Sequence, residues 1–290
     1  MSSREWDEVY RTVKQVARRM PRPRYKPVFG DALIVSMYLW SVHHDRTQGW
    51  ACRRENYNSQ FRPTRLPSES RFSRRIRSER CQRLLTEVNR EMADVGQPGN
   101  TNCLDGRPFV VGGCSKDRQA KPGRVRGGKA RGYRMHALTS EDRRVLNWVI
   151  TPMNEAESTR AHQLIETATA VGNIILADAV FDASYLYDAA AARGSMLIAA
   201  IRKDRLKSQP RANRNSPERI AAVENWKNGL SQYLYRDRIM VEGTFGNQSS
   251  YAGGLGPLPA WVRTLPRVTR WIGAKLILYH ARLRLRVAAA

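Results

Sequence analysis

The residues best suited to chemistry lie in the stretch from Tyr235 to Gly246, where Glu242 stands in a strongly basic tail. Read as a helix, each residue turns by about 100°, so Tyr235, Arg238 and Glu242 fall within a stripe of roughly 60°. A carboxylate beside a guanidinium and a phenol suits a metal ion together with a phosphate. The alternative is an ordinary i, i+4 ion pair on a solvated helix. The choice depends on whether other carboxylates reach the same place.

Two further acids stand where such convergence is expected. Asp105 lies inside an expected strand, Asn102–Gly112, and Asp178 ends the apolar run Asn173–Ala179, which is typical of a buried central strand. If the hairpin of the next two strands occupies one edge of the sheet and the crossovers are right-handed, these two strands are neighbours. Glu242 then reaches the same place from the helix after the last strand. Three oxygen ligands suit Mg²⁺, which leaves room for phosphate oxygens and water.

The elements that would position these acids alternate after residue 100 in an α/β pattern. Three antiparallel strands are followed by alternating helices and parallel strands, which predicts a mixed five-stranded sheet flanked by helices. The other expected strands are 133–139, 145–150 and 196–201, and the expected helices are 156–171 and 184–192. Residues 116–134 are interpreted as a flexible basic loop. A last basic helix is expected from about residue 260 to 287.

The chain before residue 98 has a different pattern and predicts a small all-α domain. Helices are expected at 1–20, 31–42, 68–77 and 82–92, with Ser68 as an N-cap. The stretch from Gly96 to Asn100 is the clearest linker. The expected division is therefore a helical domain, 1–98, and an α/β domain, 99–290, that includes the basic C-terminal helix.

Composition indicates a polyanionic partner. The 290 residues carry a formal charge of +24 and a pI near 10.7, and nucleic acid fits this better than a membrane surface does. The sequence shows no membrane-spanning run, lipidation signal or secretory signal. Four cysteines without a C-x-x-C pair fit a reducing cytoplasm. Five histidines form no ligand cluster, and His136 is interpreted as a packed strand residue.

Exposed arginines supply candidate contacts to DNA. The expected helix at 68–77 leaves Arg71, Arg74 and Arg75 facing outward, and it could either enter a major groove or cover phosphates. Arg263, Arg267 and Arg270 of the last helix are expected to hold phosphates and position DNA without reading it. Asp182 is expected to cap the helix that starts at Ser184, in preference to binding metal.

Three segments resemble a known family. Leu104-Asp-Gly-Arg-Pro-Phe-Val-Val-Gly-Gly with Ser115-Lys-Asp resembles a first-Asp segment, and Ala177-Asp-Ala-Val-Phe-Asp182 a second. Tyr235-x-x-Arg-x-x-x-Glu242 matches the start of a Tyr-Arg-Glu-Lys signature. Together, over nearly the whole chain, they resemble the DDE transposases of bacterial insertion sequences, the insertion-sequence-four superfamily and its relatives, which have an RNase H-like catalytic domain.

The resemblance implies roles for individual residues. Asp105, Asp178 and Glu242 would be the catalytic residues and the metal ligands, while Tyr235, Arg238 and Lys116 would contact DNA. One position departs from the pattern: the signature lysine is expected at 249, where this chain has Ser249. A catalytically silent, transposase-derived DNA-binding protein is therefore the alternative. A general RNase H-like nuclease is disfavoured by the helical front domain.

The activity implied is that of a transposase, with metal-dependent cleavage and strand transfer at the ends of an insertion sequence. The expected cofactor is Mg²⁺, with Mn²⁺ able to substitute, and no nucleotide cofactor is needed. The expected partners are terminal inverted repeats, target DNA and a second copy of the chain in the synaptic complex. The expected location is the cytoplasm, in association with the nucleoid.

Overall fold

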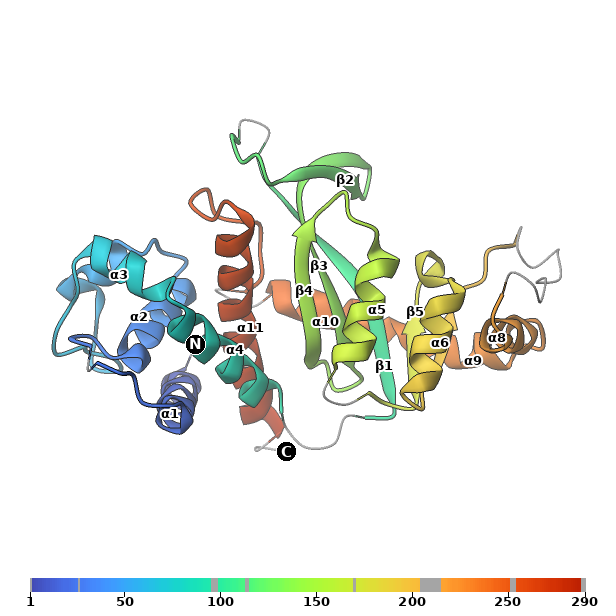
Figure 1. The fold of residues 1–290 in the computed structure, drawn as a ribbon, viewed down its shortest axis with the longest axis horizontal. Coiled ribbons are helices and arrows are strands. Elements are labelled where there is room, and N and C mark those ends of the chain that lie inside the picture. The colour runs from blue at the N-terminus through green and yellow to red at the C-terminus, as the bar shows by residue number, and fades with distance from the viewer. Residues whose placement is uncertain are drawn as a thin grey trace. The chain divides into compact units, whose positions relative to one another are not determined.

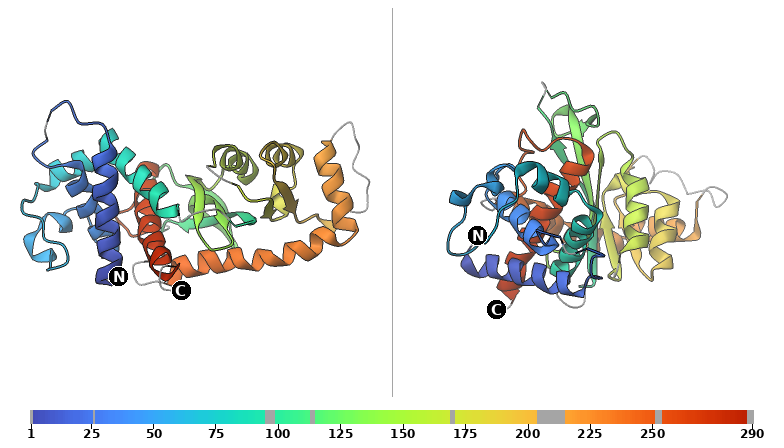
Figure 2. Two further views of the ribbon diagram at one scale, coloured as in Figure 1. Left: turned by 90° about the horizontal axis from the view of Figure 1, so that it is seen from below. Right: turned by 60° about the vertical axis from the view of Figure 1, so that its left-hand side comes forward.

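The computed structural model describes residues 2–25, 27–94, 99–112, 115–168, 171–203, 215–250 and 254–287, without the side chains of 240–242, 250 and 287. Most of the expected linker, the middle of the loop at 202–217 and Cys114 therefore lie outside the described residues. The chain divides into two compact units, Met1–Val95 with Gln248–Ala290, and Gly96–Asn247. Figures 1 and 2 show the elements of both units.

The first unit is all-helical. Its elements are α1 (Ser3–Arg19), α2 (Asp31–His43), the short 3₁₀ turns η1 (Trp50–Cys52) and η2 (Arg54–Asn56), α3 (Glu69–Ile76), α4 (Glu79–Ala93) and α11 (Leu265–Val287). Ser2 and Glu5 form a capping box that satisfies backbone donors at the start of α1. Helix α2 is apolar on all sides and buried from Ile34 to Val42, as expected of a central helix. Ser68 stands at the N-cap of α3, but its side chain accepts no hydrogen bond there, so it does not cap the helix as expected.

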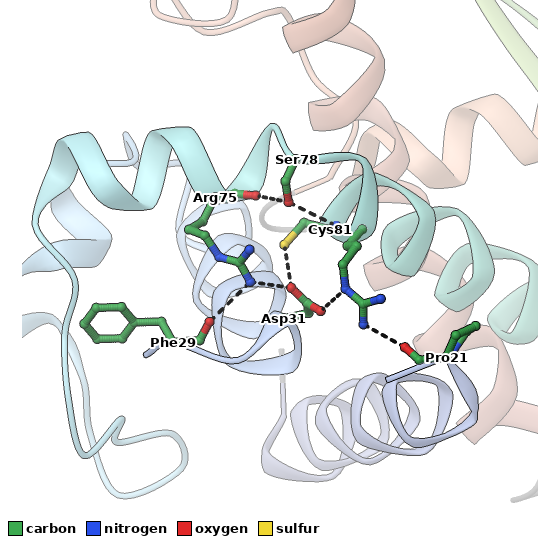
Figure 3. A network of polar contacts seen from close by, with 7 residues as sticks. Pro21, Phe29, Asp31, Arg75, Ser78 and Cys81 are labelled. Carbon is green, nitrogen blue, oxygen red and sulfur yellow. Dashed lines mark hydrogen bonds and ion pairs between the residues drawn. The ribbon is translucent and has the colours of Figure 1, made fainter. Parts of the chain in front are cut away.

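A buried carboxylate joins three of these helices (Figure 3). Asp31, in the first turn of α2, accepts from Arg75 Nη2 at 2.5 Å and from Arg80 Nε at 3.0 Å. The Sγ of Cys81 lies 3.6 Å from Asp31 Oδ1, and Arg80 also donates to the carbonyl of Pro21. The corner between α3 and α4 is therefore tied to the start of α2.

The C-terminal helix belongs to this first unit. The division expected from the sequence assigned it to the α/β domain, 99–290. Helix α11 packs against α1, α2 and α4, and Trp271, Ile272 and Ile277 are buried in their common core. Asn89 Nδ2 donates to the carbonyl of Gly273 at 3.2 Å. The correction follows from apolar burial, which the order of elements along the chain does not reveal.

Charged contacts hold the other end of the same helix. Arg282 pairs with Glu5 at 3.2 Å, and Arg284 pairs with Glu8 at 3.2 Å. Arg284 also donates to backbone carbonyls at the end of α4. Basic residues near the C-terminus of α11 thus contribute to the packing of this unit.

The second unit is built on a mixed sheet of six strands: β1 (Thr101–Val110), β2 (Lys121–Val125), β3 (Gly128–Ser140), β4 (Val145–Pro152), β5 (Ile174–Ala177) and β6 (Met196–Ala199). The order is β2-β3-β1-β5-β6, and β4 also pairs with β3. β3 is antiparallel to β1, β2 and β4, while β1, β5 and β6 are parallel. The prediction of a mixed sheet with β1 beside β5 is confirmed. The count of five strands is wrong, because part of the expected basic loop forms β2.

Helices cover both faces of this sheet. Helices α5 (Glu157–Thr167) and α6 (Ser184–Ala192) pack on the face that carries Leu104 and Ala177. On the opposite face, Cys103, Leu176 and Ile198 contact Trp226, Leu234, Tyr235 and Phe245. These partners come from α8 (Pro217–Lys227), α9 (Leu230–Tyr235) and α10 (Ile239–Ser250), and α9 and α10 run along that side of the strands in Figure 2.

The segment from Tyr235 to Gly246 is not one continuous α-helix. Helix α9 ends at Tyr235, the 3₁₀ turn η4 covers Arg236–Arg238, and α10 then begins at Ile239. A tighter turn keeps residues three apart on one side, so Tyr235 and Arg238 stay adjacent. Among the helices that the structure describes, none is both long and apolar enough to cross a lipid bilayer.

Candidate active site

Two carboxylates stand side by side where β1 and β5 run in parallel. The register pairs Leu104 with Ala177, so Asp105 and Asp178 follow at equivalent positions on neighbouring strands. Because side chains alternate between faces, both acids point to the face opposite Leu104, on which α9 and α10 pack. Both are half-buried, so they remain open to a ligand.

Backbone donors fix one oxygen of each carboxylate. The Oδ1 of Asp105 accepts from the amide of Gly106, and the Oδ1 of Asp178 accepts from the amide of Val180, each at 2.8 Å. Asp178 is the N-cap of the 3₁₀ turn η3 (Ala179–Phe181), which directly follows β5. Backbone amides inside β1 and in the turn after β5 thus orient the two acids.

Tyr235 and Arg238 lie next to these acids. Arg238 Nη1 donates to Tyr235 Oη at 3.0 Å. Burial raises the pKa of Tyr235, and Asp178 and Asp105 act in the same direction. Burial opposes the charged form of Arg238, but the interactions with Tyr235, Asp105 and Asp178 raise its pKa overall. The phenol, the guanidinium and both carboxylates therefore share one electrostatic environment.

A second arginine, which the sequence analysis did not single out, compensates the acids from the other face. Arg134 of β3 is 8% exposed, forms an ion pair with Glu157 and donates to the carbonyl of Arg124 at 2.7 Å. Burial lowers the pKa of Arg134, while Asp105 and Asp178 oppose that shift. Its partner Glu157 lies so close that a Cβ at Gly106 would stand 2.6 Å from Glu157 Oε2, so a side chain at this position would displace the Glu157 carboxylate.

The backbone of residue 242 lies in α10, which is tied to the strand of Asp105. Arg107 Nη1 donates to the carbonyl of Phe245 at 2.8 Å, and Phe245 follows Glu242 by about one helical turn. The side chain of Glu242 lies outside the described residues. Within the parts of the chain that are described, no three His, Cys, Asp or Glu side chains form a metal-binding group.

Oxygen donors of this kind fit a divalent metal. Two adjacent carboxylates are hard ligands, and neighbouring like charges are costly to bury unless a cation compensates them. Arg238 and Arg134 provide part of that compensation from the protein itself. Asp105 and Asp178 therefore form the described part of a site that could hold such an ion.

Asp182 is placed differently from either sequence interpretation. The N-cap of α6 is Ala183, and no side chain caps that helix. Asp182 is 6% exposed and receives two hydrogen bonds from Arg219 of α8, Nε to Oδ1 at 2.8 Å and Nη2 to Oδ2 at 2.9 Å. It is the acid of a buried ion pair, because α8 brings Arg219 to a position that local sequence does not indicate.

The candidate DNA contacts in the helical unit divide into exposed and buried residues. Arg71 and Arg74 of α3 and Arg267 of α11 are exposed, and Arg263 is half-buried just before α11. Arg75 does not face outward as expected, because it is bound to Asp31. Arg270 is 8% exposed and hydrogen-bonded to Tyr38, and burial lowers its pKa, so it is part of the core.

Lys116 is exposed ahead of β2 in the α/β unit. Ser249 is exposed in α10, just past the residue at which the α/β unit ends. Arg107, Arg134 and Glu157 are the site neighbours that sequence reasoning missed. Their contacts depend on strand register, and only the closeness of Arg107 to Asp105 in the sequence could have indicated one of them.

Comparison with known proteins identifies the group to which the chain belongs. The family model described as "Transposase DDE domain" matches residues 97–254, which include both Asp105 and Asp178, the turn at Tyr235 and all of α10. The chain belongs to the DDE transposase family. Members of this family cleave DNA strands and transfer them in reactions that depend on divalent metal ions, and this transposase has the same function.

Two other comparisons add little to the transposase assignment. No curated protein sequence matches the chain. Among solved structures, the chain is similar to a piggyBac transposase in a synaptic complex with hairpin DNA, solved by cryo-electron microscopy. That likeness has 10% sequence identity and a TM-score of 0.43, and covers 96% of this chain and 71% of the other. A likeness this distant has no bearing on the site.

Proposed function

We propose that Asp105, Asp178 and Glu242 are the catalytic residues of this transposase and hold its divalent metal ions. The observation that carries the proposal is the equivalent position of Asp105 and Asp178 on parallel neighbouring strands, facing the helix that contains residue 242. Mg²⁺ is the proposed physiological ion, with Mn²⁺ as a substitute, because the donor set consists of carboxylate oxygens. The catalytic fold is proposed to be RNase H-like.

The residues of this chain have separate tasks in the proposed reaction. Asp105 and Asp178, each held by a backbone amide, supply carboxylate oxygen ligands from the neighbouring strands β1 and β5. Arg238, positioned by Tyr235, binds a phosphate oxygen of the DNA strand next to them. Bound divalent metal supplies charge neutralisation for the attacking and leaving oxygens in an in-line displacement. Arg134 limits the mutual repulsion of the acids from the other face.

The proposed DNA substrates are the ends of an insertion sequence and a target site. A charge of +24 supports a polyanionic partner. The first unit is proposed to bind the terminal inverted repeats, with Arg71, Arg74 and Arg267 as exposed phosphate contacts. Two ends imply a homodimer in the synaptic complex. The proposed place of action is the cytoplasm, at the nucleoid.

The test is metal-dependent nicking of a plasmid that carries the gene with its native flanks. Asp178→Asn is compared with Asp188→Asn, which makes the same chemical change at an exposed position of α6. We expect discrete breaks at the flanks in the wild type and in Asp188→Asn, and loss of cleavage by at least a hundredfold in Asp178→Asn at equal DNA occupancy. Undiminished cleavage by Asp178→Asn would overturn the proposed site.

Ser249 favours a second candidate, a DNA-binding protein without catalytic activity. The residue is exposed in α10, at the position where the family signature has a lysine. A wild type that binds the flanks and never cuts them, but gains cleavage in Ser249→Lys, would establish this candidate. Cleavage by the wild type would exclude it.

A further inference from the structure

The basic segment after β1 folds into a two-stranded ribbon. β2 pairs with the start of β3 from Lys121 with Gly132 to Val125 with Gly128. The pairing of β1 with β3 ends at Gly132, and that of β4 with β3 ends at Tyr133. Beyond those residues β3 pairs with β2 alone, and the ribbon extends from the sheet in Figure 1.

The ribbon and its approach concentrate positive charge on their surface. Seven cations are exposed: Lys116, Arg118, Lys121, Arg124, Arg126, Lys129 and Arg131. The one acid of the segment, Asp117, is 7% exposed and accepts from the hydroxyl of Tyr133 at 2.6 Å. Because that acid is turned inward, it neutralises little of the charge that a partner would meet.

The two faces of the ribbon differ. On one face Gly123 stands opposite Ala130, and a Cβ at Gly123 would lie 2.5 Å from the carbonyl oxygen of Met153. That face packs closely on the chain after β4. On the other face Arg124 stands directly opposite Lys129. Like charges opposite each other destabilise a strand pair, so the fold itself does not account for this arrangement.

We propose that this ribbon, through Arg124, Arg126 and Lys129, grips the phosphates of duplex DNA beside the site of cleavage. A two-stranded β-ribbon fits the major groove of B-DNA, and cations on its outer face can reach both phosphate chains. The inference rests on the proposed function, since it assumes that DNA is cleaved at Asp105 and Asp178. It adds a second contact surface in the α/β unit, formed by residues outside the active site.

The length of β3 determines how far the cations of the ribbon lie from the two acids. Lys129 precedes Ala137, the partner of Asp105, by eight residues of β3. At ~3.3 Å per residue this separates the ribbon from the acids by roughly 25 Å, or about seven base pairs of B-DNA. The contacted phosphates therefore lie within about seven base pairs of the cleaved bond.

The first test measures how binding to the flank duplex depends on salt. Arg124→Gln/Lys129→Gln is compared with Arg83→Gln/Lys227→Gln, which removes two exposed charges from α4 and α8. The quantity measured is the slope of log K, the association constant for DNA, against the logarithm of the salt concentration. We expect this negative slope to become shallower by about 1.8 in the ribbon variant, ~0.9 for each lost phosphate contact, and by less than half as much in the control. Equal changes in both variants would mean diffuse attraction and would overturn the proposal.

The second test uses a photoreactive amino acid in place of Arg126 and maps its crosslinks to the flank DNA. Crosslinks within about seven base pairs of the cleaved bond support the grip. Crosslinks confined to more distant DNA, or none in a complex that cuts normally, would overturn it. The wild type could bind DNA with a salt dependence that the ribbon variant reduces, and yet never cut it. That result would contradict the proposed function but would support the contact between the ribbon and the DNA phosphates.

Discussion

At the scale of single residues, the site depends on arginines that compensate two adjacent acids from both faces of the sheet. Arg238 and Tyr235 lie on the face of the carboxylates, and Arg134 lies on the other face with Glu157. Without such cations, Asp105 and Asp178 would raise the free energy of the fold by mutual repulsion. The protein's own arginines therefore help to keep the two acids together.

The strand that holds Arg134 also holds a buried histidine that makes stability depend on pH. His136 is 2% exposed, as the sequence predicted for a packed strand residue, and its Nε2 lies 2.9 Å from Thr151 Oγ1. Burial, with smaller effects of Arg134 and Arg160, lowers the pKa of His136 to about 4. The unfolded chain, with a histidine pKa near ~6.5, takes up the proton first.

We predict that this contribution to stability is complete above about pH 6.5 and is lost as the pH falls toward 4. When the pH falls from 7 to 4.5, the free energy of unfolding should fall in both proteins. The fall should be smaller in His136→Gln than in the wild type, by about 2 kcal/mol. Urea unfolding of both proteins at the two pH values measures the difference. Equal losses would show that His136 titrates in the folded protein as it does in the unfolded one.

At the scale of elements, the turn after Asp178 is held by a buried ion pair. Asp182 follows the 3₁₀ turn η3, and Arg219 binds it from α8 with two hydrogen bonds. Tyr187 Oη lies 3.4 Å from the same carboxylate. The pair connects the strand end that carries Asp178 to a helix far along the chain.

We predict that Asp182→Ala destabilises the protein by about 3 to 5 kcal/mol, because the Arg219 guanidinium is left buried without its carboxylate. The double variant Asp182→Leu/Arg219→Met should recover most of that loss, since it removes both charges and keeps the volume filled. Thermal unfolding measures both variants. A double variant as unstable as Asp182→Ala would mean that something other than the unpaired charge causes the loss.

Much of the element order could be read from the sequence, because apolar runs and turn residues mark it. The pairing of β1 with β5 was expected from a hairpin at one edge of the sheet and from right-handed crossovers. β2 was missed, because Lys121-Pro-Gly-Arg-Val has low strand propensity and is stabilised by pairing with β3. The contacts of Arg75 and Arg219 were missed, since their partners lie 44 and 37 residues away.

At the scale of the whole molecule, the units are not consecutive in the chain. Helices from residues 1–95 and 248–290 share one core, while the α/β unit is formed by the residues between them. The division falls inside α10, shortly after Glu242. The first unit therefore needs both ends of the chain to complete its core.

We predict that a fragment of residues 1–95 does not fold by itself. Removing α11 exposes the apolar surfaces against which Trp271, Ile272 and Ile277 pack. It also removes Arg282 and Arg284, which pair with Glu5 and Glu8. The fragment should give poorly dispersed amide NMR signals that become dispersed when a peptide of residues 248–290 is added. A fragment that is well dispersed without the peptide would contradict this account.

The proposal that Asp105, Asp178 and Glu242 form one metal site is tested by Mn²⁺ binding to the protein in complex with its flank DNA. Electron paramagnetic resonance of free Mn²⁺ gives the affinity for the wild type, Asp105→Asn, Asp178→Asn, Glu242→Gln and the control Asp188→Asn. We expect each of the first three variants to bind Mn²⁺ at least tenfold more weakly, while the control binds as the wild type does. Wild-type affinity in Glu242→Gln would contradict a site of three converging acids.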